Sequence, residues 1–151
     1  MGSVAVPLAD LPARTGRELA VSPWLEVSQE RIDRFADATG DRQWIHVDPE
    51  RARSGPFGGT IAHGFLLLSL LPALMWEALS VEGARLVVNY GCNKVRFTAP
   101  VPAGSRVRAR ITLAATEPRE GALQATWTVV VEREGAPKPA LVAEWIGLYL
   151  T

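Results

Sequence analysis

The sequence contains very few of the residues that build disulfides and metal clusters. Among its 151 residues there is one cysteine, Cys92, and there are two histidines, His46 and His63. A single cysteine cannot form a disulfide within the chain, and one cysteine with two histidines is a poor ligand set for a metal. We therefore expect no metal site. Because Cys92 lies in a strand-like run, we interpret it as a small core residue rather than a nucleophile.

The chain also lacks an excess of charge of either sign. Sixteen lysines and arginines balance sixteen aspartates and glutamates, so no global positive field attracts nucleic acid or an acidic membrane surface. Residues 1–16 lack the basic start and long apolar centre of a secretory signal, and we expect a cytoplasmic protein. A hydrophobic content of 48% and a charged content of 21% are typical of a soluble globular domain.

One long apolar run, IAHGFLLLSLLPALMWEAL over residues 61–79, has to be distinguished from a membrane span. A span needs roughly 20 predominantly apolar residues, and strand patterns that suit a soluble sheet follow this run. A helix that is apolar on all sides is also what a protein core contains. We therefore predict a buried helix and no membrane span. The run is interrupted by five residues that a span disfavours: His63, Gly64, Ser69, Pro72 and Glu77.

Helical patterns come before strand patterns along the chain, without alternation of the two. Ser28 is a suitable N-cap for a helix that Gly40 ends, and Asp48 with Pro49 begins a second, short helix. After Gly83 the apolar residues alternate with the period of a strand. The predicted strands cover residues 85–90, 93–97, 105–113, 123–131 and the last run, 141–150.

This order predicts a single α+β domain, in which an antiparallel sheet wraps around the long central apolar helix. Residues 1–21 contain Pro7, Pro12 and Gly16 but no sustained periodicity, so we interpret them as an N-terminal arm that lies on the domain. The domain itself extends over residues 22–151. No internal repeat or low-complexity linker divides it.

The stretch ATGDRQWIHVDPERA, residues 38–52, places Asp41 and His46 five positions apart. Taken alone, Asp41 just after a helix-ending glycine is typical of local backbone hydrogen bonding, and a lone histidine is more often structural than catalytic. However, His46 stands among Trp44, Ile45 and Val47, which exclude water and shift pKa values. A carboxylate and an imidazole that share one small space can hold a water and move its proton.

Gly64 stands in an AHG motif at the start of the apolar run. Because glycine has no side chain, a ligand can approach its backbone closely. The N–H groups of a first helical turn have no partner within the helix, and they suit the oxygen of a carbonyl that becomes an enolate. The alternative is a glycine that is needed only for tight packing of the helix on the sheet.

Three separated segments resemble a known family. The pattern GD-x-x-x-x-H from Gly40 to His46, with Gly64 eighteen positions after the histidine, is similar to the MaoC-like family of hot-dog-fold hydratases. QWIHVDPERA, GGTIAHGF and NYGCNKVRFTAPVPAGSRV resemble its NodN-like branch, which includes R-specific enoyl-CoA hydratases. The resemblance covers roughly Ser22 to Leu150.

The resemblance implies a hot-dog fold, commonly a homodimer with a continuous sheet. It implies that Asp41 and His46 are the catalytic pair and that the Gly64 N–H is the oxyanion donor. The implied reaction is the reversible addition of water to a trans-2-enoyl thioester, giving the (3R)-hydroxy product, with no metal or redox cofactor. The implied partner is an acyl-CoA or an acyl-carrier-protein thioester. A carrier-protein dehydratase and a non-catalytic acyl-binding protein remain alternatives.

The chain departs from the common family pattern at two places. Gln43 and Trp44 stand where many members have Asn-Pro. We group Gln43 with the substrate-binding residues and leave open whether its side chain helps to orient the loop. Pro72 stands where some short-chain hydratases carry a serine, which leaves the acyl-chain preference open.

Three further residues are candidates near the predicted site. His63 precedes Gly64 and is placed with the oxyanion and substrate-binding group, as a residue that packs at the helix start or stands behind the site. Lys94 and Arg96 alternate with apolar neighbours and could contact substrate phosphates. For that pair, a solvated strand face is the alternative.

Overall fold

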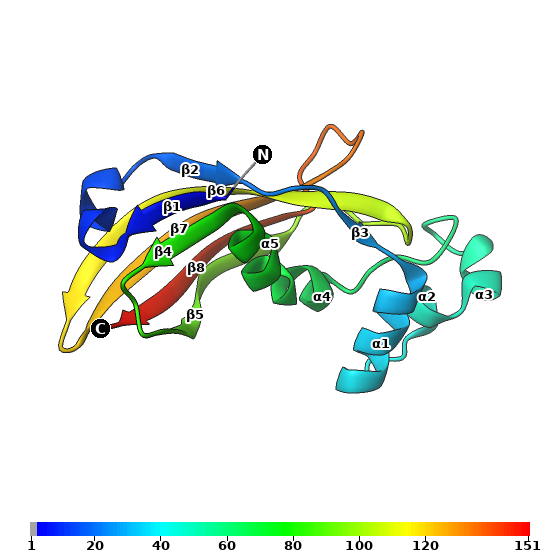
Figure 1. The fold of residues 1–151 in the computed structure, drawn as a ribbon. Helices are drawn as coiled ribbons and strands as arrows, with labels where there is room; N and C mark the ends of the chain where they lie inside the picture. The colour runs from blue at the N-terminus through cyan, green and yellow to red at the C-terminus, as the bar shows by residue number, and fades with distance from the viewer. Residues whose placement is uncertain (1–2) are drawn as a thin grey trace.

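The computed structural model describes residues 3–151 and has the predicted α+β architecture. A long, curved antiparallel sheet lies against helices α4 and α5, while helices α1 to α3 gather at one end of the molecule (Figure 1). The strands are β1 Val4–Pro7, β2 Glu18–Val21, β3 Leu25–Val27, β4 Leu79–Glu82, β5 Leu86–Phe97, β6 Ser105–Arg119, β7 Ala122–Arg133 and β8 Leu141–Leu150. The helices are η1 Leu8–Arg14, α1 Gln29–Thr39, α2 Trp44–Val47, α3 Pro49–Arg53, α4 Gly64–Ser69 and α5 Leu71–Ala78.

The main sheet has six strands in the order β2-β6-β7-β8-β5, with β3 also pairing to β6. All of its pairings are antiparallel. Strand β6 alternates as the sequence predicts, since its apolar side chains are buried against the helices while the residues between them are less buried. The predicted inward residues of β6 are all buried: Val107, Ala109, Ile111 and Leu113.

The predicted single helix over residues 61–79 is wrong in its length and in its complete burial. The helical residues begin at Gly64 and form two pieces, α4 and α5, that meet at Leu70. Pro72 explains the break, because proline has no N–H to donate to the carbonyl four residues earlier. Phe65 and Trp76 are 67% and 71% exposed, so one side of this helical segment faces away from the sheet. Among residues 3–151, no helix has the length and apolarity that crossing a bilayer requires.

The predicted arm, residues 1–21, forms more regular structure than its sequence indicates. Met1 and Gly2 lie outside the described residues. Strand β1 pairs in parallel with β4, and β2 pairs antiparallel with β6. Both strands have only four residues, which is too short for a sequence periodicity to be recognised. The arm therefore lies on the domain through strand pairing.

Strand β5 corrects two predictions. The strands predicted at 85–90 and 93–97 are one strand, whose pairing with β8 shifts in register between Asn89 and Gly91 and again between Cys92 and Val95. Cys92 is exposed rather than part of the core. The reason is that β5 is the last strand of the sheet, and all but one of its residues are exposed. Strand-like character at this position therefore does not imply burial.

Candidate active site

Three short helices position the stretch that carries Asp41 and His46. The Ser28 side chain caps α1 by accepting from the Arg31 N–H, and Gly40 ends α1 in the left-handed conformation with φ of 82°. The chain then turns into α2, which contains His46, and the Asp48 side chain caps α3 by accepting from the Arg51 N–H. These caps confirm the predicted helix boundaries at Ser28, Gly40 and Asp48. They fix the direction of the chain on both sides of His46.

The His46 ring is buried and has a defined tautomer. Its Nδ1 lies 2.7 Å from the carbonyl oxygen of Ile61. Because a carbonyl only accepts, Nδ1 carries the proton and the neutral ring has a free lone pair at Nε2. Burial lowers the pKa of His46 below its ordinary value; the bond to Ile61 raises it, the nearby His63 lowers it and Asp41 raises it. The burial of His46 therefore favours its neutral form, whose Nε2 lone pair can accept a proton.

A polar network beneath His46 was not found by sequence reasoning. The Gln29 side-chain amide donates to the His46 carbonyl oxygen at 2.7 Å and to Asp33 at 2.9 Å. The buried Thr60 hydroxyl donates to the Gln29 side-chain oxygen. Gln29 thus ties the first turn of α1 to α2 and to the segment before Gly64. No spacing or motif marks it, because its partners are 17 and 31 positions away along the chain.

The structure brings Asp41, His46 and His63 together. The Asp41 carboxylate and one ring nitrogen from each histidine lie within 4.8 Å of one another. The two rings are stacked, with centroids 3.9 Å apart and planes 25° apart. His63 is 2% exposed, whereas Asp41 is exposed. The cluster therefore combines a carboxylate that solvent reaches with two buried imidazoles.

This cluster is the one group of three metal-ligand side chains that lie this close together among residues 3–151. Each histidine already uses one nitrogen on a backbone carbonyl. Lone pairs of stacked, nearly parallel rings run side by side and converge poorly on one ion, whereas a zinc site needs ligands that converge tetrahedrally. The absence of a metal remains a prediction.

Gly64 is the first residue of α4 and packs tightly against β5. A Cβ added at Gly64 would lie 2.8 Å from Cγ of Phe97 and 2.9 Å from both Cδ atoms. The packing of α4 on the sheet therefore requires a glycine here, which agrees with the alternative given in the sequence analysis, a glycine needed for tight packing. Its N–H belongs to the first helical turn, where no partner exists within the helix. Packing on Phe97 and a free N–H are compatible, because the ring contacts the side where a side chain would project.

The remaining predicted residues do not join this cluster. Gln43 is the N-cap of α2, and its N–H reaches the Asp41 carboxylate at 3.4 Å. Lys94 and Arg96 lie on the exposed strand β5. Lys94 is 3.6 Å from Glu144, and Arg96 donates to the carbonyl oxygen of its neighbour Val95. Their contact with substrate phosphates remains a prediction.

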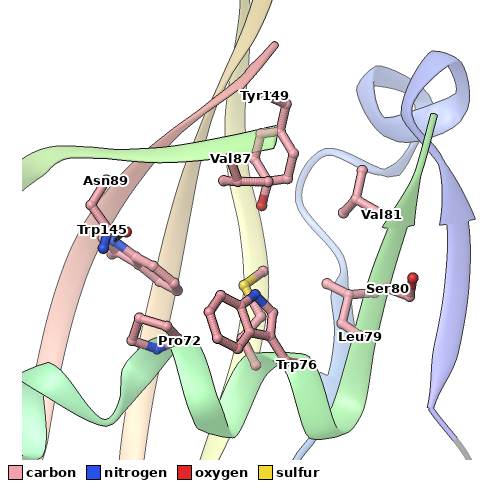
Figure 2. A pocket seen from close by; sticks show the side chains of 10 residues that line it. Pro72, Trp76, Leu79, Ser80, Val81, Val87, Asn89, Trp145 and Tyr149 are labelled. Atoms are coloured by element: carbon pink, nitrogen blue, oxygen red, sulfur yellow. Dashed lines mark hydrogen bonds between the residues drawn. The ribbon is translucent and has the colours of Figure 1, made fainter. Parts of the chain in front are cut away.

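A groove runs between the helical segment and strands β5 and β8. One cavity of about 470 Å³ is lined by Trp76, Val87 and Trp145, whose side chains point toward one another across the space in Figure 2. A second cavity of about 380 Å³ extends the groove toward Leu68. The two cavities share Pro72, Asn89 and Trp145. Neither includes Asp41 or His46, but Leu68 is one helical turn beyond Gly64.

Fold and site together are those of a small hot-dog protein with a carboxylate–imidazole cluster at the start of its central helix. A family model described as MaoC like domain matches residues 10–134. The chain belongs to the MaoC-like dehydratase family. This confirms the resemblance seen in the sequence.

Relatives and solved structures agree with this assignment. The chain is 56% identical over 144 residues to 3-hydroxyacyl-thioester dehydratase Z of Mycobacterium tuberculosis, covering 95% of each protein. It is 51% identical over 142 residues to nodulation protein N of Rhizobium leguminosarum bv. viciae, covering 92% of this chain and 88% of that protein. Among solved structures, an (R)-hydratase from A. caviae involved in PHA biosynthesis aligns with a TM-score of 0.70 and 26% identity, covering 87% and 96%.

Proposed function

We propose that the protein is an (R)-specific hydratase and dehydratase, which adds water reversibly to trans-2-enoyl-CoA and gives the (3R)-hydroxyacyl-CoA. The observation that carries the proposal is the pairing of the Asp41 carboxylate with the buried His46, whose Nδ1 donates to Ile61 and leaves the Nε2 lone pair free. Two hydrogen bonds of about 2.8 Å that meet at one water span about 4.5 Å. A separation within 4.8 Å therefore suits a single water held between the two groups. The names of the dehydratase and hydratase relatives support the same chemistry.

In the proposed hydration, the water oxygen attacks C3 of the enoyl thioester. The water loses one proton as it attacks, and C2 gains one proton. Asp41 and His46 hold the water; one of them accepts its proton as the C3–O bond forms, and the pair then passes this same proton on to C2, so that the elements of one water are added across the double bond. The Gly64 N–H donates to the thioester carbonyl oxygen, which makes C3 electrophilic and stabilises the developing enolate. Dehydration is the reverse sequence. The chemistry requires no metal or redox cofactor.

The groove along α5 suits the acyl chain of such a thioester. It begins beyond Gly64, where the carbonyl would be bound, and continues past Pro72 to Trp76. Trp76 lies in α5, twelve residues beyond Gly64, and a rise of 1.5 Å per helical residue places it at most roughly 18 Å away along the segment. The groove therefore has room for acyl tails considerably longer than a four-carbon chain, and we propose that medium-length chains are accepted.

The exposed edge of the sheet supports a homodimer. Strand β5 has a neighbour on one side only, and it exposes Leu86, Val88 and Tyr90 by 43%, 43% and 61%. A long apolar edge strand is a site for pairing with another chain. A second copy that pairs its own β5 antiparallel to this one would continue the sheet. Val88→Lys is expected to give a monomer by sedimentation, and a dimer that persists unchanged would contradict this interface.

The function is tested by comparing turnover and binding in matched variants. Wild type is expected to remove the conjugated enoyl absorbance of crotonyl-CoA, while Asp41→Asn and His46→Gln keep substrate binding and lose at least about a hundredfold in kcat. The asparagine and glutamine side chains are close in shape to the aspartate and histidine that they replace.

Two other outcomes identify the alternatives. Turnover of a carrier-bound but not a CoA-bound enoyl group would indicate a carrier-protein dehydratase. Binding without turnover in wild type on both substrates, unchanged in Asp41→Asn, would indicate an acyl-binding protein and would overturn the proposal.

A further inference from the structure

We propose that His63 is a positioning residue that holds the loop of the catalytic Asp41 through its Nε2–H. The inference rests on the proposed function of Asp41, but the contact itself is independent of it. His63 Nε2 lies 2.9 Å from the main-chain carbonyl oxygen of Asp41. These residues are 22 positions apart, so the bond joins the loop after α1 to the start of α4.

This bond is the shortest polar contact of Asp41 in the described part of the chain. The Asp41 N–H reaches the Thr39 hydroxyl at 3.4 Å, and the Asp41 carboxylate receives the Gln43 N–H at 3.4 Å. Both of these lie beyond the usual range for N–H···O bonds, whereas 2.9 Å is the commonest length. An exposed loop residue is thus anchored mainly by one buried imidazole.

The surroundings of His63 fix the orientation of its ring. It is stacked on His46 at 3.9 Å, and the Phe35 ring lies 4.9 Å from it on a tilted plane. Because the Asp41 carbonyl only accepts, the neutral ring has its proton on Nε2 and a bare Nδ1. His46 has the opposite tautomer, with its proton on Nδ1. The two stacked histidines therefore have complementary tasks: one presents a base, and the other holds the carboxylate partner.

These contacts fit a positioning role for His63 better than a role in binding the substrate. Its side chain is 2% exposed and its Nε2 is already engaged by Asp41. The other nitrogen, Nδ1, is buried and has no hydrogen-bond partner within residues 3–151. A buried acceptor without a partner is costly, so Nδ1 does not account for a histidine at this position. The Nε2 bond and the stacking on His46 are the features that explain its presence.

Two variants separate these two features. His63→Gln places a side-chain N–H near the position of Nε2 and removes the ring. His63→Phe keeps a ring beside His46 and removes the bond to Asp41. We expect His63→Phe to lower kcat tenfold or more with KM changed by less than about threefold, because Asp41 is displaced relative to the bound substrate. We expect His63→Gln to stay within about threefold of wild type. A near-normal kcat in His63→Phe, or an equal loss in both variants, would overturn the proposal.

A second measurement separates failure of this proposal from failure of the proposed function. In ¹⁵N-labelled wild type, two-bond proton–nitrogen correlations of the histidine rings are expected to show the proton of His63 on Nε2 and that of His46 on Nδ1. The backbone amide signals of Asp41 and Arg42 are expected to shift in His63→Phe and to stay nearly unchanged in His63→Gln. This readout needs no turnover. If no enoyl thioester is a substrate, it still decides whether His63 holds the loop, and His63 protonated on Nδ1 alone would exclude the bond.

Discussion

Replacing Gly64 by alanine distinguishes its packing from its proposed role as a donor. The added Cβ would lie 2.8 Å from Cγ of Phe97, whereas ordinary van der Waals contact begins at 3.4 Å. The two atoms must therefore move apart by 0.6 Å. Overpacking of this kind costs about 1–3 kcal/mol, and the better helix propensity of alanine returns up to about 1 kcal/mol. With the full return, the net loss is about 0–2 kcal/mol, which for a chain of this size lowers Tm by up to about 8 °C.

The same displacement moves the Gly64 N–H, since the Phe97 ring is supported on one side by Phe65 at 5.9 Å. A shift approaching 1 Å costs up to a hundredfold in rate, so we expect Gly64→Ala to lose about tenfold or more in kcat/KM on crotonyl-CoA. Adding Phe97→Ala removes the atoms that clash. The double variant is therefore expected to match Phe97→Ala alone in both Tm and kcat/KM, because the clash is gone and alanine retains the N–H. Recovery of Tm without recovery of kcat/KM would refute this reasoning and show that the methyl group itself blocks the substrate.

Four further predictions concern the base, its support and the groove. Because burial and His63 lower the pKa of His46, the acid limb of kcat/KM should lie below the ordinary histidine pKa of about 6.5; a limb above that value would show that His46 is not the titrating base. Because of the same pKa shift, the unfolded chain binds the His46 proton more readily than the folded chain does. The His46 contribution to stability is therefore complete above about pH 6.5 and is lost as pH falls from there through the folded-state pKa. Urea melts across pH 5–8 measure this loss as a fall in the unfolding free energy. Gln29→Leu should lower the unfolding free energy by about 1–3 kcal/mol, because the His46 carbonyl and the Thr60 hydroxyl lose their partner; an unchanged urea midpoint would contradict this. Val87→Phe should lower kcat/KM for octenoyl-CoA by at least about fivefold more than for crotonyl-CoA, because Val87 lines the far part of the groove; equal losses would place the acyl chain elsewhere.

Local chemistry explains which parts of the fold the sequence could predict. The caps at Ser28 and Asp48 and the left-handed turn at Gly40 depend on neighbouring residues only, so they could be recognised from short motifs. The alternation of Val107 to Leu113 is equally local, because one face of β6 is buried along this stretch. The family pattern added the pairing of Asp41 with His46 across a loop that has no periodicity.

The features that could not be predicted depend on contacts between distant residues. Strand β1 has four residues and pairs with β4, which is more than seventy positions later in the chain. Cys92 has a strand-like setting, but its exposure follows from the position of β5 at the edge of the sheet. The hydrogen bonds of Gln29 to His46 and of His63 to Asp41 likewise cross 17 and 22 positions. No spacing rule connects such pairs before the chain is folded.

The most direct test of the central claim is the product formed from crotonyl-CoA by the purified wild-type protein. The loss of enoyl absorbance is followed first, and the configuration of the 3-hydroxybutyryl-CoA is then determined by chiral separation. The proposed function, with its stereochemistry taken from the family resemblance, predicts a single (3R) product, and the same protein should regenerate the enoyl absorbance from (3R)-hydroxybutyryl-CoA but not from its (3S) isomer. A (3S) product, a mixture of both isomers, or no reaction with crotonyl-CoA, octenoyl-CoA or a carrier-bound enoyl group would contradict the account.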